Sequence, residues 1–245
     1  MRVLVTRIEP AASRLAALLR EDGHEVFTCP ALAIVPQKPM SGELAAARMA
    51  DAWLFASVPA VEIGWLALAP ATPPPCFAVG PATAAALRTR GVEPGLAPGS
   101  GAAEQLLTLP ALEHLQGRHV AVIRGRGGLD ALPAGLAARG ARVTLLEVYT
   151  REPLSPAQLR AAWQAQECVV ASSGDGVRAL VAAAGHAHEG APASSGTMLA
   201  DELRAATLLV PSARVAKLAH ALGFLRVIVC AGADDAAVRA ALRAG

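Results

Sequence analysis

Several residue types are scarce in this 245-residue sequence, which has no asparagine, one tyrosine, two lysines and only 3% aromatic residues. Its four cysteines stand far apart without paired spacing, and three of them lie inside apolar runs. We therefore expect buried cysteines that act as small hydrophobic side chains, with no disulfide or structural zinc. The formal net charge of +2 is too small to indicate nucleic acid as the main partner.

Segments suited to a membrane or to secretion are also missing. The longest stretch without a charge, residues 63–87, contains five prolines, which a membrane-spanning helix does not tolerate at this density. Residues 1–7 enter a predicted strand directly, without the apolar run and cleavage site of a signal peptide. We expect a cytoplasmic protein of one large or two ordinary domains with no membrane partner.

Common catalytic and nucleotide-binding motifs are absent as well, including G-x-S-x-G, the Walker motif, H-E-x-x-H and CxxC. Residues 124–128 resemble a phosphate loop, but their glycine spacing fits neither known fingerprint. His186 and His188 lie in a polar stretch, residues 185–196, which we predict to be a mobile surface loop without further metal ligands. The other histidines, including His119, read as surface or helix-face residues without partners.

What the sequence does contain is an internal repeat. Residues 3–6 and 25–29 read as strands, and residues 11–20 between them read as a helix with leucines on one face. A shift of 117 positions reproduces this unit and places Arg7 on Arg124. Further strand-turn-helix pairs recur at shifts of 115 and 131, and the shift of 131 predicts helices that begin near residues 102 and 233. Strands that alternate with helices throughout predict an α/β fold with parallel sheets.

Ligands of such sheets bind at the carboxyl ends of strands, where helix N-termini favour anions. We therefore expect a ligand with several carboxylates or phosphates, held by residues that follow predicted strands. These candidates are Arg7, Ser57, Gly80, Thr83, Arg124, Ser172, Ser173, Gly174 and Ser212. Structural roles remain open for them: the serines could cap helices, at about 1 kcal/mol each, and the arginines could pair with nearby acids.

Two matching stretches, residues 26–36 and 143–153, read as strands that continue into connectors, because each exceeds an average strand and ends in proline. If these connectors pair, they form the waist of a two-lobed molecule. The second stretch holds the single tyrosine, Tyr149, which could serve chemistry or simply pack at the junction. The matching position in the first stretch is Leu32, so the connectors are chemically different.

Six ordered segments together resemble the uroporphyrinogen-III synthase family. They are V-L-V-T-R near the start, W-L-F-A-S-V-P-A-V from Trp53, V-G-P-A-T-A-A-A-L from Val79, L-E-V-Y from Leu146, V-V-A-S-S-G-D-G from Val169 and V-P-S-A-R-V-A from Val210. Two positions depart from the family pattern: Pro59 replaces the usual asparagine, and Ser212-Ala213 replaces a common threonine pair. At both positions backbone contacts are expected more than side-chain contacts.

The resemblance implies an α/β protein of two lobes, each with a parallel sheet flanked by helices, joined by a two-stranded β ladder. One lobe would comprise residues 1–33 plus 152–245 and the other residues 34–151, with the active site between them. The family needs no cofactor and no metal, and it favours monomers. The lobes implied in this way are not the two sequence repeats.

The implied reaction is the cyclisation of hydroxymethylbilane, with loss of water and inversion of ring D through a spiro intermediate, in haem biosynthesis. Tyr149 would be the best candidate acid, because a phenol carries its proton at neutral pH. The implied substrate-binding residues are Arg7, Ser57, Gly80, Thr83, Ser172, Ser173, Gly174 and Ser212. The substrate would be the main partner, beside at most a transient contact with the preceding pathway enzyme. Alternatives are a non-catalytic binding protein for a small polyanion, a regulator built on this fold, and a flavodoxin-like protein.

Overall fold

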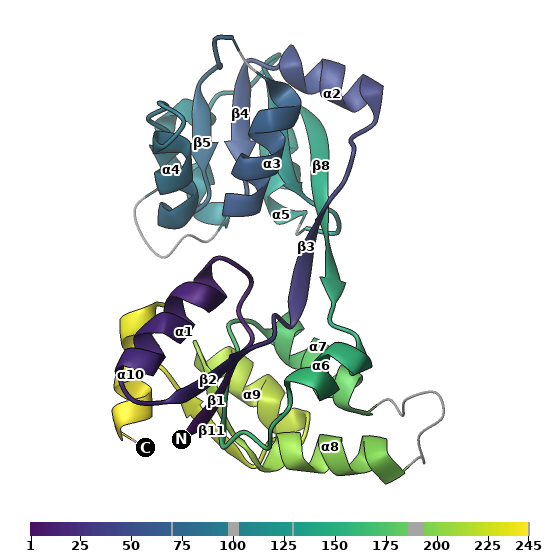
Figure 1. The fold of residues 1–245 in the computed structure, drawn as a ribbon. Coiled ribbons are helices and arrows are strands. Elements are labelled where there is room, and N and C mark those ends of the chain that lie inside the picture. The colour runs from purple at the N-terminus through teal and green to yellow at the C-terminus, as the bar shows by residue number, and fades with distance from the viewer. Residues whose placement is uncertain (70, 98–102, 129, 186–193, 245) are drawn as a thin grey trace. The chain divides into compact units, whose positions relative to one another are not determined.

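The computed structural model describes residues 1–69, 71–97, 103–128, 130–185 and 194–244 (Figure 1). Its contacts divide the chain into two compact units. Unit 1 consists of Met1–Ala33 and Glu152–Gly245, and unit 2 consists of Ile34–Arg151. Strands alternate with helices in both units, as the repeat predicts.

Unit 1 is built on a five-stranded parallel sheet in the order β11-β10-β9-β1-β2. Its strands are β1 (Arg2–Val5), β2 (Glu25–Thr28), β9 (Cys168–Val170), β10 (Thr207–Val210) and β11 (Arg226–Val229). Its helices are α1 (Ala11–Glu21), α6 (Pro156–Ala162), α7 (Gly174–Gly185), α8 (Ser194–Ala205), α9 (Ala213–Ala221) and α10 (Asp235–Ala244). Helices α1 and α10 cover one face of the sheet, and α6 to α9 cover the other (Figure 1).

Helix α1 shows how the sequence pattern positions these elements. Ala12, Leu15, Ala16 and Leu19 are its buried residues, and they recur at the spacing of one helix face. They pack against β1 and β9 through Val3, Val5 and Val170, which alternate along their strands. Gly23 lies in the turn between α1 and β2 with a φ of 86°, which glycine adopts without strain.

Unit 2 is built on a six-stranded sheet in the order β3-β8-β7-β4-β5-β6. Its strands are β3 (Leu32–Pro36), β4 (Ala52–Phe55), β5 (Cys76–Ala78), β6 (Gly95–Leu96), β7 (His119–Gly125) and β8 (Arg142–Pro153). Its helices are α2 (Ser41–Arg48), α3 (Val58–Leu68), α4 (Pro81–Arg88) and α5 (Ala131–Ala138), with 3-10 helices η1 (Ala103–Thr108) and η2 (Pro110–Leu112). Helices α2, α3 and α4 pack on one face, and α5, η1 and η2 pack on the other.

The two long connectors pair as predicted, because β3 is the hydrogen-bonded neighbour of β8. Strands β8, β7, β4, β5 and β6 run parallel to their neighbours over the paired residues. Their carboxyl ends therefore share one edge of the sheet. The predicted α/β class with a two-stranded ladder is thus confirmed, with a parallel sheet in unit 1 and a mixed sheet in unit 2.

Two local predictions need correction. Residues 194–196, assigned to a loop on their serine and glycine content, form the first turn of α8, whose Leu199, Ala200 and Leu203 pack in the core. Residues 186–193, with His186 and His188, lie outside the described residues. The helix expected near residue 102 is the short 3-10 helix η1, and residue 102 itself is not described.

The four cysteines are buried free thiols, as predicted. Burial raises the pKa of the Cys76 thiol to about 11 and, with the nearby Cys230 and Glu167, that of Cys168 to about 12. Such thiols stay protonated at neutral pH and act as apolar packing groups. In the part of the chain that the structure describes, no helix has the length and apolar character needed to span a bilayer.

Candidate functional site

The predicted residues of unit 1 meet at one edge of its sheet. Arg7 follows β1, residues 172–174 follow β9, and Ser212 follows β10. These three strands are adjacent and parallel, and Val170 of β9 stands level with Val5 of β1 and Leu209 of β10. The sequence rule that strand ends gather ligand-binding residues therefore brings all of them to the same edge.

Arg7 at this edge is engaged by its own chain. Its side chain is buried, and its guanidinium donates to Asp235 Oδ1 at 2.5 Å and to the carbonyl oxygen of Ala233 at 2.8 Å. Arg14 binds the other carboxylate oxygen of Asp235 at 2.6 Å. Burial raises the pKa of Asp235, but the hydrogen bonds and charges of Arg14 and Arg7 outweigh it and hold that pKa below its usual range. Arg7 thus fastens the start of α10, and its contact with a ligand stays a prediction.

Arg124, the repeat partner of Arg7, behaves in the same way in unit 2. Its guanidinium donates to Asp130 Oδ1 at 2.9 Å, to the carbonyl oxygen of Gly128 at 3.0 Å and to Glu147 Oε1 at 3.3 Å. The two arginines occupy equivalent positions at the ends of equivalent strands, and both bind acids. For this pair of residues, the structural alternative raised by the sequence is correct.

The strand-end serines cap helices, with one exception. Ser57 caps α3 and Ser212 caps α9, through bonds of 3.2 Å from the Ala60 N–H and 3.5 Å from the Val215 N–H. Ser173 caps α7, because its Oγ accepts the Gly176 N–H at 3.1 Å. Capping was one of the two roles left open for Ser172, but α7 begins at Gly174, which puts Ser172 one residue too early for a cap and leaves it exposed.

Beside this edge, a cavity of about 150 Å³ lies between the N-terminal turns of α7 and α9. Its lining residues are Gly174, Asp175, Arg178, Arg214, Val215 and Leu218. Two arginines and the positive ends of two helices suit a carboxylate or phosphate group. The sequence reasoning stopped at the strand ends and missed both arginines, although each lies within one helical turn of a predicted residue.

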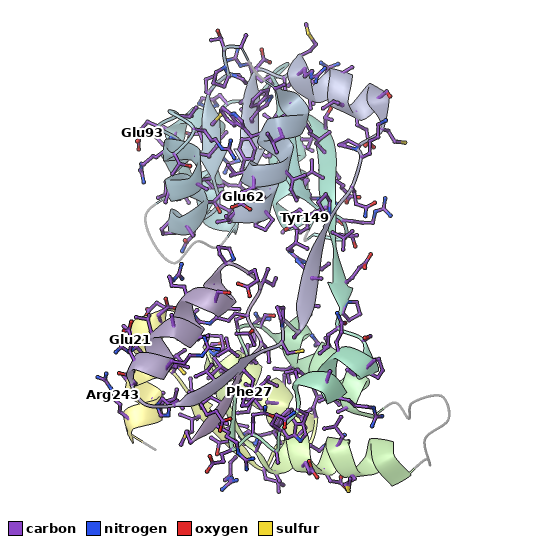
Figure 2. The ribbon with its side chains drawn as sticks, in the orientation of Figure 1. Glu21, Phe27, Glu62, Glu93, Tyr149 and Arg243 are labelled. Carbon is purple, nitrogen blue, oxygen red and sulfur yellow. The ribbon has the colours of Figure 1, made fainter. Side chains whose placement is uncertain are left out.

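Tyr149 is the centre of the predicted site in unit 2, and Figure 2 labels it there. It is 1% exposed, and its hydroxyl lies 3.0 Å from the Ser57 hydroxyl. The structure thus joins two predicted residues that are 92 positions apart in the chain. Either hydroxyl can donate in this pair, and the Ser57 oxygen also accepts the Ala60 N–H.

Arg151 is the functional candidate that sequence reasoning missed in this unit. Its guanidinium carbon lies 5.7 Å from the centre of the Tyr149 ring, and its Nη2 lies 3.4 Å from the phenol oxygen. A cation at this distance over an aromatic ring is attracted to it. The signal was present in the sequence, because residues two apart on a strand share one face.

The remaining candidates of unit 2 sit at the starts of helices. Gly80 follows β5 and occupies the N-cap position of α4 in extended backbone, with Thr83 in the first turn. Thr83 is 5% exposed, which limits the reach of its hydroxyl to a ligand. Pro59 has no backbone N–H, and Ser57 takes that of Ala60, so α3 offers an anion fewer donors than expected.

His119 was expected on the surface without a partner, and this was wrong. It is 4% exposed at the start of β7, with Nε2 2.8 Å from Thr144 Oγ1 and Nδ1 2.8 Å from Arg142 Nη2. Since Arg142 can only donate, Nδ1 accepts and the ring is neutral with its proton on Nε2. Burial and the charge of Arg142 lower the pKa of His119.

A family model described as uroporphyrinogen-III synthase HemD matches residues 13–238. Over 261 aligned positions, the chain is 32% identical to the uroporphyrinogen-III synthase of Escherichia coli K12, with 99% of this chain and all of that one covered. The Salmonella typhimurium LT2 protein of the same name is 29% identical with the same coverage.

Two solved structures share the fold. A mutant uroporphyrinogen III synthase from the extremely thermophilic bacterium Thermus thermophilus matches with a TM-score of 0.61 at 21% identity, covering 100% of this chain and 98% of that one. The Helicobacter pylori 26695 uroporphyrinogen-III synthetase matches with a TM-score of 0.63 at 15% identity and full coverage of both chains. From the family model and the full-length match to the Escherichia coli protein, it follows that the chain belongs to the uroporphyrinogen-III synthase family.

Proposed function

We propose that the protein cyclises hydroxymethylbilane to uroporphyrinogen III, with loss of water and inversion of ring D through a spiro intermediate. Membership of the family and full-length similarity to the Escherichia coli enzyme support the activity. The observation that carries the mechanism is the hydroxyl pair of Tyr149 and Ser57 at the carboxyl ends of the unit 2 strands.

Tyr149 acts as the acid that assists departure of the substrate hydroxyl. In this step Ser57 donates its proton to the phenol oxygen, an arrangement that the 3.0 Å contact between the two hydroxyls permits. The phenol proton is then free to pass to the leaving hydroxyl, which departs as water. Ser57, as the hydrogen-bond donor, stabilises the negative charge that develops on the phenol oxygen.

Arg151 also controls access to the phenol. Tyr149 is almost fully buried, and the exposed Arg151 lies over its ring. A carboxylate of the substrate that pairs with Arg151 draws the guanidinium away from the ring and uncovers the hydroxyl. The acid is thereby kept from bulk water until the substrate is bound.

The strand ends of unit 1 bind other carboxylates of the substrate. The serine hydroxyls and backbone amides at residues 172–174 and 212 lie next to the cavity with Arg178 and Arg214. Arg7 supports this edge through Asp235. In unit 2, Gly80 and Thr83 at the start of α4 contribute contacts of the same kind. Fixing the arms of a flexible linear tetrapyrrole favours ring closure through the spiro intermediate over closure without inversion.

Product analysis tests the proposal. The purified protein is incubated with freshly prepared hydroxymethylbilane, and the cyclised product is oxidised and resolved into isomers I and III. Isomer III is expected in excess over a protein-free control, which closes spontaneously to isomer I. Formation of isomer I alone, at the spontaneous rate, would overturn the proposed activity.

A further inference from the structure

We propose that Gly125 is a positioning residue for Tyr149, whose ring occupies the space that a side chain at position 125 would fill. The inference rests on the acid role proposed for Tyr149. It assigns a task to the glycine-rich stretch at residues 124–128, which no phosphate-binding fingerprint explains.

A β-bulge in β8 turns the tyrosine toward this glycine. Arg124 of β7 pairs with Glu147 and Gly125 pairs with Tyr149, so Val148 is the extra residue between two successive pairs. The ladder continues beyond the bulge, where the Arg126 N–H donates to the Tyr149 carbonyl oxygen at 2.8 Å.

The bulge changes the face on which the phenol lies. Leu145 packs on the α5 side of the sheet, whereas Leu146 and Val148 pack on the α3 side. Strict alternation would send Tyr149 to the α5 side with Leu145. Val148 and Tyr149 instead both pack on the α3 side, where Ser57 caps α3. Without the bulge, regular alternation of residues 145–149 would place the phenol on the opposite face from its hydrogen-bond partner.

Gly125 provides the room for the ring on that face. A Cβ atom at position 125 would lie 2.5 Å from Tyr149 Cε2 and Cζ and 2.9 Å from its hydroxyl oxygen. Real Cβ atoms do not approach other atoms this closely, so the hydroxyl end of the ring would have to move. Gly125 is outside the left-handed backbone region, so the close approach of the ring, and not the backbone conformation, opposes an alanine there.

The neighbouring glycines have other tasks. Gly127 adopts a φ of 67° in the turn after β7, and the Gly128 carbonyl oxygen accepts a bond from Arg124. The Gly128 N–H reaches the Gly125 carbonyl oxygen at 3.3 Å. These contacts close the turn on itself. The turn therefore lies beside the Tyr149 ring, and its first glycine, Gly125, determines the position of the phenol.

The decisive variant is Gly125→Ala. Because the added methyl group displaces the phenol from its position beside Ser57, we expect kcat for isomer III to fall by about 10²-fold, in line with a displacement of ~1 Å at a reacting group. KM should change less than kcat, because no predicted carboxylate contact is removed. Circular dichroism at the assay temperature establishes that the variant is folded.

Gly95→Ala is the matched control. Its Cβ would lie 2.5 Å and 2.7 Å from two ring atoms of Phe77, so it introduces a similar clash in the same sheet, on β6 rather than next to Tyr149. It should lower the melting temperature while retaining kcat wherever the protein is folded. If both variants lose kcat in proportion to their stability, or if Gly125→Ala keeps wild-type kcat, Gly125 does not position Tyr149.

Two further backgrounds separate this inference from the role of Tyr149 itself. In the Tyr149→Ala background, Gly125→Ala should not lower the free energy of unfolding, since the ring is gone. If Gly125→Ala destabilises this background as much as the wild type, the clash is not with the Tyr149 ring and the inference is refuted. In Tyr149→Phe, adding Gly125→Ala should not reduce kcat further, and an additive loss would overturn the inference. If Tyr149→Phe alone has wild-type kcat, the acid role fails, and a loss in Gly125→Ala would then need another cause.

Discussion

Replacing Ser57 by alanine removes two hydrogen bonds of unit 2 at once. The first is the cap on the Ala60 N–H at 3.2 Å, whose loss costs about 1 kcal/mol. The second is the bond to the buried Tyr149 hydroxyl at 3.0 Å, which contributes about 1 kcal/mol. We expect a loss of about 2 kcal/mol in the free energy of unfolding, or roughly 4–8 °C in Tm at ~2–4 °C per kcal/mol.

A double-mutant cycle with Tyr149→Phe isolates the hydroxyl pair. In the Tyr149→Phe background, Ser57→Ala should cost only the cap, about 1 kcal/mol, so the coupling energy is also about 1 kcal/mol. Urea unfolding followed by circular dichroism gives the four free energies. Ser212→Ala is the matched control, since its cap bond is 3.5 Å long and involves no tyrosine.

The activity of Ser57→Ala distinguishes its role as a helix cap from its role in catalysis. Ser57→Ala should lower kcat for isomer III by about tenfold, because the phenol loses one donor to its developing negative charge. Ser212→Ala should alter KM more than kcat. A coupling energy near zero together with wild-type kcat in Ser57→Ala would refute the proposed role of the Ser57–Tyr149 hydrogen bond. The bond would then contribute neither to stability nor to catalysis.

Three further predictions follow from the described contacts. Tyr149→Phe should reduce kcat by about 10²- to 10⁴-fold without changing the circular dichroism spectrum, and a wild-type rate would exclude it as the acid. Arg214→Ala should raise KM by roughly two- to fivefold with kcat unchanged, as expected for an exposed cation on a substrate carboxylate, and Arg178→Ala should match it. Because the pKa of His119 is lowered in the folded state, stability should be full above pH ~6.5 and decline as the pH falls below it. Urea unfolding at pH 8 and pH 5.5 should show a smaller decline in His119→Leu, and an equal decline would contradict the assignment.

Most of the fold was predictable because its signals are local. The leucines of α1, the valines of β1 and the repeat at a shift of 117 positions predict the first β-α-β unit and its copy. The carboxyl ends of parallel strands share an edge whatever their side chains are, so Ser57 could be assigned to a ligand-binding edge, and the family resemblance placed Tyr149 in the same site. Their hydroxyl contact agrees with that assignment. That these units are the two lobes implied by the resemblance, residues 1–33 plus 152–245 and residues 34–151, stays a prediction.

Sequence reasoning left roles open or assigned them wrongly where a distant residue decides the role of a side chain. Arg7 pairs with Asp235, which is 228 positions away, and no local pattern indicates this pairing. His119 is buried because β8 supplies Thr144 and Arg142 as partners beside it. Ser173 caps α7 and Ser172 does not, because α7 begins at Gly174. Hydrophobic periodicity does not predict the start of a helix to within one residue.

The single tyrosine shows the division between sequence and tertiary structure most clearly. By itself the sequence determined that Tyr149 lies on a strand that runs into a connector, and that no equivalent stands on the other connector. Strict alternation along that strand assigns its ring to the wrong face. The face on which the ring lies is decided only when β8 pairs with β7. Val148 is an extra residue only by comparison with the register of β7, and the glycine that leaves room for the ring, Gly125, lies on β7. Register and close packing are properties of two segments together, so neither segment's sequence contains them.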